Sequence, residues 1–273
     1  MLDSPEVIIQ IILALSVTGF VAGVMAGLLG VGGGIVIVPV LYFLFQHFGT
    51  SPDIAMFVAV GTSLATIIAT SISSVRSHHK KGAVDWPLLK SWSIGVVVGV
   101  IVGTFVASKL DGHALTVIFS IIAFIVALRM LFNKQGGHIR DGLPGQPLEF
   151  IFAFIIGSLS VMVGIGGGSI TVPILTAYNF PMRKAVACAS GIGLVIALPG
   201  AIGFVISGWG VENLPFASLG YVNLLGFVLI VPMTVLCAPL GAKIAHSVNP
   251  VYLKKGFAVF LLFTSVKMMF GAL

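Results

Sequence analysis

The sequence predicts an all-α integral membrane protein that contains two inverted repeats of about five helical segments each. Three observations lead to this fold class. Of the 273 residues, 58% are hydrophobic and only 8% are charged, whereas soluble domains carry about 25% charged residues. Several apolar stretches approach or exceed the ~20 residues that a membrane-spanning helix needs. A glycine-rich motif also occurs twice, at matching places in the two halves of the chain.

The duplication of the glycine-rich motif extends over much of the chain. The stretches GLLGVGGGIVIVPV (27–40) and VMVGIGGGSITVPI (161–174) share six identities in fourteen positions. Residues 102–115 also align without gaps with residues 240–253. We therefore divide the chain into a first transmembrane repeat (1–135), a polar cytoplasmic linker (136–147) and a second, inverted transmembrane repeat (148–273).

Each half predicts the same order of elements: a long helix, the glycines, a short helix and three further helices. In the first half we expect helices at 7–29, 35–48, 53–76, 86–109 and 113–133. In the second half we expect them at 149–164, 169–179, 183–207, 219–246 and 249–272. The short helices would reach roughly 16–21 Å, less than the ~30 Å hydrocarbon core. We expect hairpins with tips inside the membrane; whether the short helices cross it fully is left open.

Charge placement sets the orientation of these helices. Arg76, Lys80 and Lys81 crowd one loop, which the positive-inside rule assigns to the cytoplasm. The matching loop of the second half, 208–218, has no Lys or Arg and is expected outside. Both termini then lie on the outer side of a bacterial inner membrane. His78 and His79 are expected in a solvated cytoplasmic loop, and the net charge of +6 reflects such loops, not nucleic-acid binding.

The repeated glycines and prolines indicate that the helix is interrupted at these positions for a functional reason. Gly costs about 1 kcal/mol and Pro about 3 kcal/mol inside a helix, relative to Ala. Irregular backbone at membrane depth is tolerated where it is covered by protein or lines a solute path. The short helices would begin at Ile35 and Ser169, directly after the glycines. Their free N–H groups would meet near the midplane, and a helix N-terminus favours an anion.

The polar residues indicate the same class of ligand. All eight acidic residues fall in termini, loops or helix ends, which argues against a cation site or a carboxylate proton relay. Hydroxyl groups remain inside the apolar segments and can donate to anion oxygens. The candidate substrate-binding residues are Gly32, Gly33, Gly34, Gly166, Gly167, Gly168, Ser169, Thr62, Ser63 and Ser190, with Pro39 and Pro173 as candidate hinges or helix breaks.

Simpler interpretations remain beside these. Glycines in a membrane helix also permit tight helix crossing, as we expect for Gly95, Gly99 and Gly103. Prolines are tolerated in the first turn of a helix, and membrane Ser and Thr residues often bond the carbonyl four residues earlier. Cys188 and Cys237 are expected to be packing residues, because neither metal-ligand spacing nor a disulfide framework surrounds them.

The motifs together resemble the sulfite exporter TauE/SafE family, also called the 4-toluene sulfonate uptake permease family. The resemblance is carried by GLLGVGGGIVIVPVL (27–41), AVGTS (59–63) and GIGGGSITVPIL (164–175). It implies a bacterial inner-membrane permease for sulfite, thiosulfate or organosulfonates such as sulfoacetate, moved outward or inward. The second half departs from the pattern at 191–193, where Gly-Ile-Gly replaces Gly-Thr-Ser. The implied site is therefore asymmetric, with Ser190 as a candidate for the missing hydroxyl.

These observations predict a secondary transporter, with export as the expected direction, for a small sulfur-containing anion. An anion channel and a proton-coupled organosulfonate importer are the alternatives. An enzyme is not expected, because no His, Asp or Glu lies at membrane depth to act as a base. The expected partners are the anion and the lipid bilayer, without a cofactor, metal or nucleic acid, and a homo-oligomer is left open.

Overall fold

A computed structural model describes residues 5–30, 32–132, 140–247 and 251–272. The elements are α1 (Pro5–Leu29), α2 (Gly34–His47), α3 (Pro52–His79), α4 (Trp86–Ala107), α5 (Gly112–Phe132), α6 (Leu148–Val163), α7 (Gly168–Ala177), α8 (Met182–Ser207), β1 (Ser218–Leu219), β2 (Val222–Asn223), α9 (Leu224–Ser247) and α10 (Val251–Ala272). Val31 of the first motif and linker residues 136–139 lie outside the described residues.

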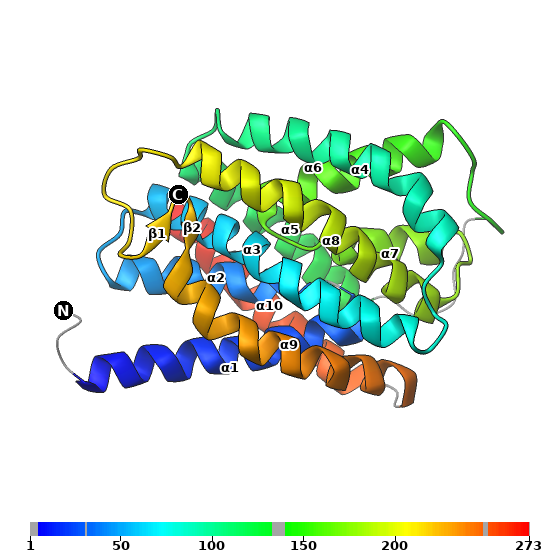
Figure 1. The fold of residues 1–273 in the computed structure, drawn as a ribbon, viewed down its shortest axis with the longest axis horizontal. Helices are drawn as coiled ribbons and strands as arrows, with labels where there is room; N and C mark the ends of the chain where they lie inside the picture. The colour runs from blue at the N-terminus through cyan, green and yellow to red at the C-terminus, as the bar shows by residue number, and fades with distance from the viewer. Residues whose placement is uncertain (1–4, 31, 133–139, 248–250, 273) are drawn as a thin grey trace.

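The helices lie side by side in four pairs, along the long axis of the molecule (Figure 1). Helix α1 packs against α9, α4 against α6, α5 against α10, and α3 against α8. Helix α3 also contacts α2, α5 and α9, so it is the central element. The short helices α2 and α7 pack mainly on α3 and α8, respectively. The glycine motifs are therefore held next to the central α3–α8 pair.

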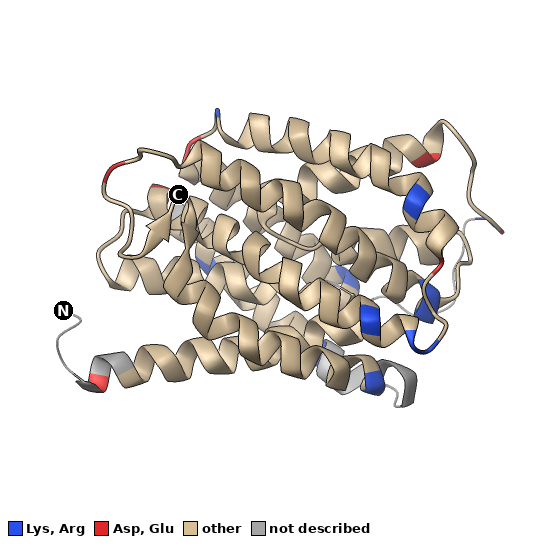
Figure 2. Cartoon of the chain, in the orientation of Figure 1, with Lys and Arg blue, Asp and Glu red and all other residues tan. Residues whose placement is uncertain are grey.

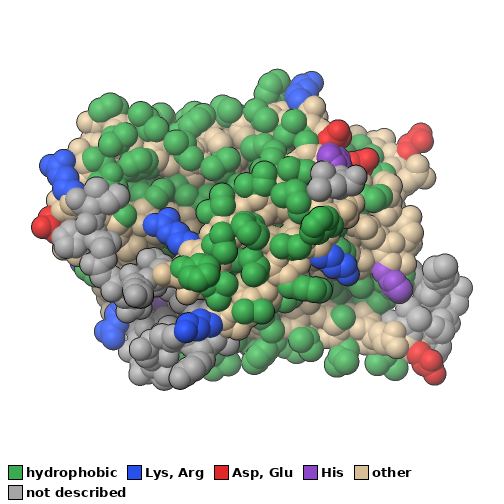
Figure 3. Space-filling view, turned by 180° about the vertical axis from the view of Figure 1, so that it is seen from behind, with side chains coloured by type: hydrophobic (Ala, Val, Ile, Leu, Met, Phe, Trp, Pro, Cys, Tyr) green, Lys and Arg blue, Asp and Glu red, His purple; other side chains and the backbone are tan. Residues whose placement is uncertain are grey.

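The helices confirm an all-α membrane protein. Within the described residues, α1, α3, α4, α5, α8 and α9 are long and apolar enough to cross a membrane, whereas α2, α6 and α7 are shorter. Large apolar side chains such as Ile94, Phe105 and Phe263 are more than 60% exposed on the outside of the bundle. Figure 3 shows hydrophobic side chains spread over the face of the molecule that is seen from behind. Such a surface matches lipid and not water.

Glycine brings two helix pairs close together, as expected for the α4 stripe of Gly95, Gly99 and Gly103. A Cβ added at Gly95 would lie 2.8 Å from Ala153 Cβ of α6, and one at Gly103 would lie 2.6 Å from Ser158 O. Helix α1 uses the same device against α9, since a Cβ at Gly23 would lie 2.7 Å from Thr234 O. These glycines serve close helix packing, which is the main source of helix association in lipid.

One expected helix is wrong at its start. Residues 219–223 were expected to begin a helix, but α9 begins at Leu224 and the residues before it form the hairpin β1–β2. The side chain of Asn223 explains this: its Nδ2 donates to Phe216 O (2.8 Å), and its Oδ1 accepts from Gly226 N (2.8 Å). The amide thus caps α9 and closes the loop, although the segment itself is apolar.

The expectation that His78 lies in a solvated loop is also wrong. Helix α3 extends to His79, and His78 is fully buried, with Nε2 3.1 Å from Gly27 O of α1. The last turn of α3 therefore packs against the end of α1. A buried imidazole needs a hydrogen-bond partner, and a carbonyl near a helix C-terminus supplies one.

Candidate functional site

The glycine motifs form two sharp turns between helices. Gly30, Gly32 and Gly33 separate α1 from α2 and have φ values of +69°, +74° and +79°. Gly164 and Gly167 separate α6 from α7 and have φ values of +68° and +73°. Residues with a Cβ rarely adopt this left-handed region. The backbone geometry therefore requires glycine at these positions, whatever binds there.

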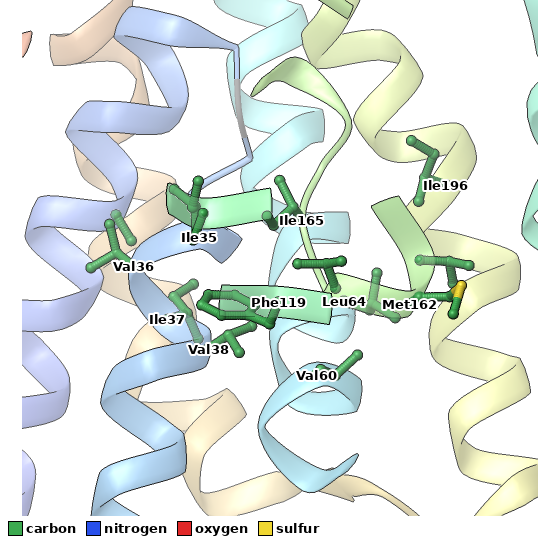
Figure 4. Packing of buried hydrophobic residues seen from close by; sticks show 14 of the residues in the cluster. Ile35, Val36, Ile37, Val38, Val60, Leu64, Phe119, Met162, Ile165 and Ile196 are labelled. Carbon is green, nitrogen blue, oxygen red and sulfur yellow. The ribbon is translucent and has the colours of Figure 1, made fainter. Parts of the chain in front are cut away.

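The two glycine turns contact each other. A Cβ at Gly32 would lie 3.2 Å from Gly166 Cα, and a Cβ at Gly34 would overlap Gly164 O. Close by, Ile35, Leu64 and Ile165 lie together in the buried core, as Figure 4 shows. The structure thus brings both predicted triplets to one place, 134 residues apart in sequence and surrounded by apolar side chains.

Both short helices begin at this junction. In α2, the N–H groups of Val36 and Ile37 donate to Gly33 O at 3.0 and 3.3 Å. In α7, the N–H groups of Ile170 and Thr171 donate to Gly167 O at 3.1 and 2.8 Å. The N–H groups that precede them have no helical acceptor, as at any helix start. Two helix N-termini, each with partial positive charge, therefore lie at adjoining turns in an apolar setting.

The prolines lie farther along the helices than a break would require. Pro39 and Pro173 are each the sixth residue of their helix, and both helices continue past them. The chain is interrupted at the glycines instead. Because proline has no N–H, the carbonyls of Ile35 and Ser169 lose their usual helical donors. This leaves each short helix locally weaker in its first two turns.

The predicted hydroxyls have different surroundings. Ser63 Oγ donates to Gly164 O (2.8 Å) and so joins α3 to the second glycine turn. Thr62 Oγ1 accepts from Asn223 N (2.8 Å) and so holds the β1–β2 hairpin against α3. Ser190 Oγ donates to Val186 O (3.1 Å) and lies 2.9 Å from Ser74 Oγ. Ser169 Oγ is buried, with no hydrogen-bond partner within the described part of the chain.

Sequence reasoning missed Ser71. It is 1% exposed, and its Oγ also lacks a hydrogen-bond partner among the described residues. A Cβ at Gly193 would lie 3.0 Å from Ser71 Oγ and 2.8 Å from Gly166 O. A signal was present: Ser63, Ser71 and Ser74 are spaced by eight and three residues, which places them on one face of α3.

Positive charge gathers at one end of the molecule (Figure 2). There Lys81 Nζ donates to Ala242 O of α9 (3.0 Å). Partial burial lowers the pKa of Lys81, and the like charges of Lys243 and Arg183 lower it further. Three cations from different segments therefore lie close enough to repel each other, and such a cluster attracts anions.

Comparison with known proteins assigns the family. The model of the family "Sulfite exporter TauE/SafE" matches residues 15–268. The chain belongs to this family. It is 32% identical over 257 residues to a probable membrane transporter protein of Haemophilus influenzae, a match that covers 94% of this chain and 97% of the relative. No solved structure matches the chain.

Further relatives of the TauE/SafE protein carry names of the same kind. A probable membrane transporter protein of Methanocaldococcus jannaschii is 30% identical, with 88% of each chain covered. The probable membrane transporter protein YunE of Bacillus subtilis is 30% identical, with 84% of this chain and 87% of the relative covered. The apolar surface, the helices and the family together identify a multi-pass membrane transporter.

Proposed function

We propose that this TauE/SafE transporter exports small sulfur-containing anions, such as sulfite, thiosulfate or organosulfonates, across a bacterial inner membrane. One observation carries the proposal: the two glycine turns from which α2 and α7 begin contact each other. The described acidic residues lie toward the ends of the molecule (Figure 2), so no carboxylate opposes an anion at the junction.

The junction offers donors that suit an oxyanion. The glycine triplets 32–34 and 166–168 have no side chains that would shield their N–H groups from an anion. Each helix N-terminus contributes roughly 0.3–2 kcal/mol to anion binding through its dipole. Of the predicted side-chain donors, Ser169 has an unused hydroxyl, whereas Ser63 and Ser190 donate theirs to backbone carbonyls and would have to exchange that bond for the anion. Thr62 supports the junction through the hairpin. The family name favours sulfite among the oxyanions.

We infer further that the two halves are inverted repeats. The packing of α1 on α9 corresponds to that of α6 on α4, if α1 is equivalent to α6 and α4 to α9. In the same alignment of the repeats, α3 is equivalent to α8 and α5 to α10. Each of these two packed pairs therefore joins a helix to its own counterpart in the other half. This pattern supports a pseudo-two-fold axis through the junction. Transporters with such repeats place the substrate near the membrane midplane, at the repeat interface.

The charges support the proposed topology. The basic end of the molecule would face the cytoplasm under the positive-inside rule. The beginning of α1 and the end of α10 lie at the opposite end in Figure 1, which favours an outer location for both termini. An interior-negative potential drives an anion outward by about 2.3 kcal/mol per charge per 100 mV. Export therefore requires no coupling ion. Alternating access would need hinges, and Pro39 and Pro173 are the candidates for them.

The test is flux of sulfite, thiosulfate, sulfoacetate and chloride in proteoliposomes. For wild type we expect saturable flux of the sulfur anions and no flux of chloride. The double variant Gly33→Val plus Gly167→Val is expected to lose this flux, because valine cannot adopt φ near +75° without strain. Gly256→Ala is the control, since a Cβ there meets nothing within 4 Å.

The same flux assay decides among the functions. Non-saturating flux with single-channel currents would show a channel instead of a transporter. Sulfoacetate accumulation that requires an inward proton gradient would show a coupled importer. Unchanged flux in a glycine double variant that inserts and elutes as wild type would overturn the anion site at the junction.

A further inference from the structure

Most of the unpartnered buried hydroxyls of the described residues belong to segments at the second glycine turn, and none belongs to the described residues of the first. Among the described residues, six buried polar side-chain atoms have no hydrogen-bond partner, and four of them are the hydroxyls of Ser71, Ser160, Ser169 and Thr171. The other two, Gln46 Nε2 and Thr104 Oγ1, lie away from the glycine turns. Ser160 precedes the second turn on α6, and Ser169 and Thr171 follow it on α7. Buried hydroxyls are almost always hydrogen-bonded, so such a group requires an explanation.

Ser71 reaches the same turn from another helix. Its Oγ and Gly166 O lie 3.0 and 2.8 Å from the place that a Gly193 Cβ would occupy. Ser71 is therefore directed at the gap between α8 and the second glycine turn, and any side chain at position 193 would fill that gap. Ser71 and Thr171 are 1% and 0% exposed, so their surroundings are the protein interior.

Among the described residues, the first turn has no such unpartnered hydroxyl. Ser63, the aligned counterpart of Gly193, uses its hydroxyl on Gly164 O (2.8 Å). Gly34 at the start of α2 is packed so closely on Gly164 O that a Cβ would overlap it. The N-terminus of α2 is therefore covered by the backbone of the second turn. The N-terminus of α7 instead lies on the side of the unpartnered hydroxyls.

We propose that the anion binds at the N-terminus of α7 and that Ser71 donates a hydrogen bond to it. The first glycine turn then serves to position the second. This inference rests on the proposed function, because it names the half of the junction that holds the substrate. An oxyanion with several oxygen acceptors can take the Ser71 hydroxyl and the N–H groups of Gly168 and Ser169 together.

The experiment compares Ser71→Ala with Thr70→Ala. Thr70 is fully buried on the same helix, but its hydroxyl is used on Thr66 O (2.9 Å). In Ser71→Ala we expect the KM for sulfite to rise about 10-fold to 100-fold, the loss typical of a hydrogen bond to a charged group. In Thr70→Ala we expect a KM within about twofold of wild type.

Thermal unfolding in detergent separates binding from folding. Because Ser71 Oγ has no hydrogen-bond partner among the described residues, Ser71→Ala should unfold without ligand at the wild-type temperature or above it. The stabilisation of wild type by sulfite should be lost in Ser71→Ala and kept in Thr70→Ala. An unchanged KM, or a lower unfolding temperature with an unchanged sulfite effect, would overturn the assignment of Ser71.

A panel of anions separates this inference from the proposed function. Wild type and both variants are heated with sulfite, thiosulfate, sulfate, phosphate and chloride. If only phosphate stabilises wild type and Ser71→Ala abolishes that effect, the sulfur-anion function fails and the Ser71 site stands. If sulfite stabilises wild type and Ser71→Ala equally, the site fails and the function stands. If no anion stabilises wild type and none is transported by it, both the proposed function and the Ser71 site fail.

Discussion

Thr62 and Ser63 are consecutive residues in the AVGTS motif, yet their hydroxyls have different tasks. Thr62 accepts from Asn223 N of the hairpin, whereas Ser63 donates to Gly164 O at the glycine junction. Gly61, just before them, is packed against the backbone of Tyr221 in the same hairpin. At the residue scale, one short motif thus supports the hairpin through Gly61 and Thr62 and the junction through Ser63.

Thr62→Val should lower stability without weakening substrate binding. The variant keeps the shape of threonine but leaves the buried Asn223 N–H without its acceptor, which costs about 1–3 kcal/mol. Thermal unfolding in detergent measures this loss, and sulfite flux should give an unchanged KM. A raised KM at an unchanged unfolding temperature would instead make Thr62 a substrate contact.

Gly34→Ala should strongly reduce transport, although alanine is the smallest change available. The new Cβ would overlap Gly164 O and lie 2.8 Å from Ser63 Oγ, so two backbone segments would have to separate. Flux should fall more than about tenfold, since a shift of about 1 Å at a site can cost that much. Gly256→Ala makes the same replacement in open space and should keep full flux; equal flux in both variants would contradict the close packing.

At the scale of elements, glycine stripes hold the outer helix pairs, and apolar side chains fill the centre. Helices α4 and α6 are also joined by a hydrogen bond from Trp92 Nε1 to Glu149 Oε2 (3.0 Å) near one end. Close backbone contact along such pairs leaves them rigid, because interiors at native density cannot absorb added volume. Added volume at the glycines of these pairs should therefore force the helices apart.

Gly103→Val should separate α4 from α6. A Cβ at Gly103 would lie 2.6 Å from Ser158 O and 2.7 Å from Val161 Cγ1, so the helices must move apart. Overpacking of this kind costs typically about 1–3 kcal/mol, which thermal unfolding would record. Gly271→Val on α10 is the matched control because a Cβ there meets nothing within 4 Å. Similar unfolding temperatures for both variants would refute the role of the α4 stripe.

The long helices could be predicted because continuous apolar runs specify them, and the glycine turns because the motif repeats. The β1–β2 hairpin could not, since Leu219, Tyr221 and Val222 continue the apolar run of α9 and only the tertiary contacts of Asn223 stop the helix. The role of Ser71 could not be predicted from the sequence for a similar reason. It lies outside every repeated motif, and its position opposite Gly193 depends on how α3 packs on α8.

At the scale of the whole molecule, the uneven charge should speed the entry of anions from the basic end. Lys81→Gln combined with Lys243→Gln removes two cations that lie near each other. With thiosulfate supplied at that end, kcat/KM should fall several-fold at low salt, because the cluster concentrates anions. The difference should vanish near 1 M salt, where the screening length is about 3 Å. Proteoliposome flux at several salt concentrations measures both effects.

The pH dependence follows from the lowered pKa of Lys81. Raising the pH discharges Lys81 before an ordinary lysine, so the wild-type advantage over the double variant should shrink as the pH rises. Lys109→Gln, beyond the far end of α4, is the control and should leave this entry rate unchanged. An equal loss in Lys109→Gln would mean that net charge alone, and not the cluster at the basic end, draws the anion in.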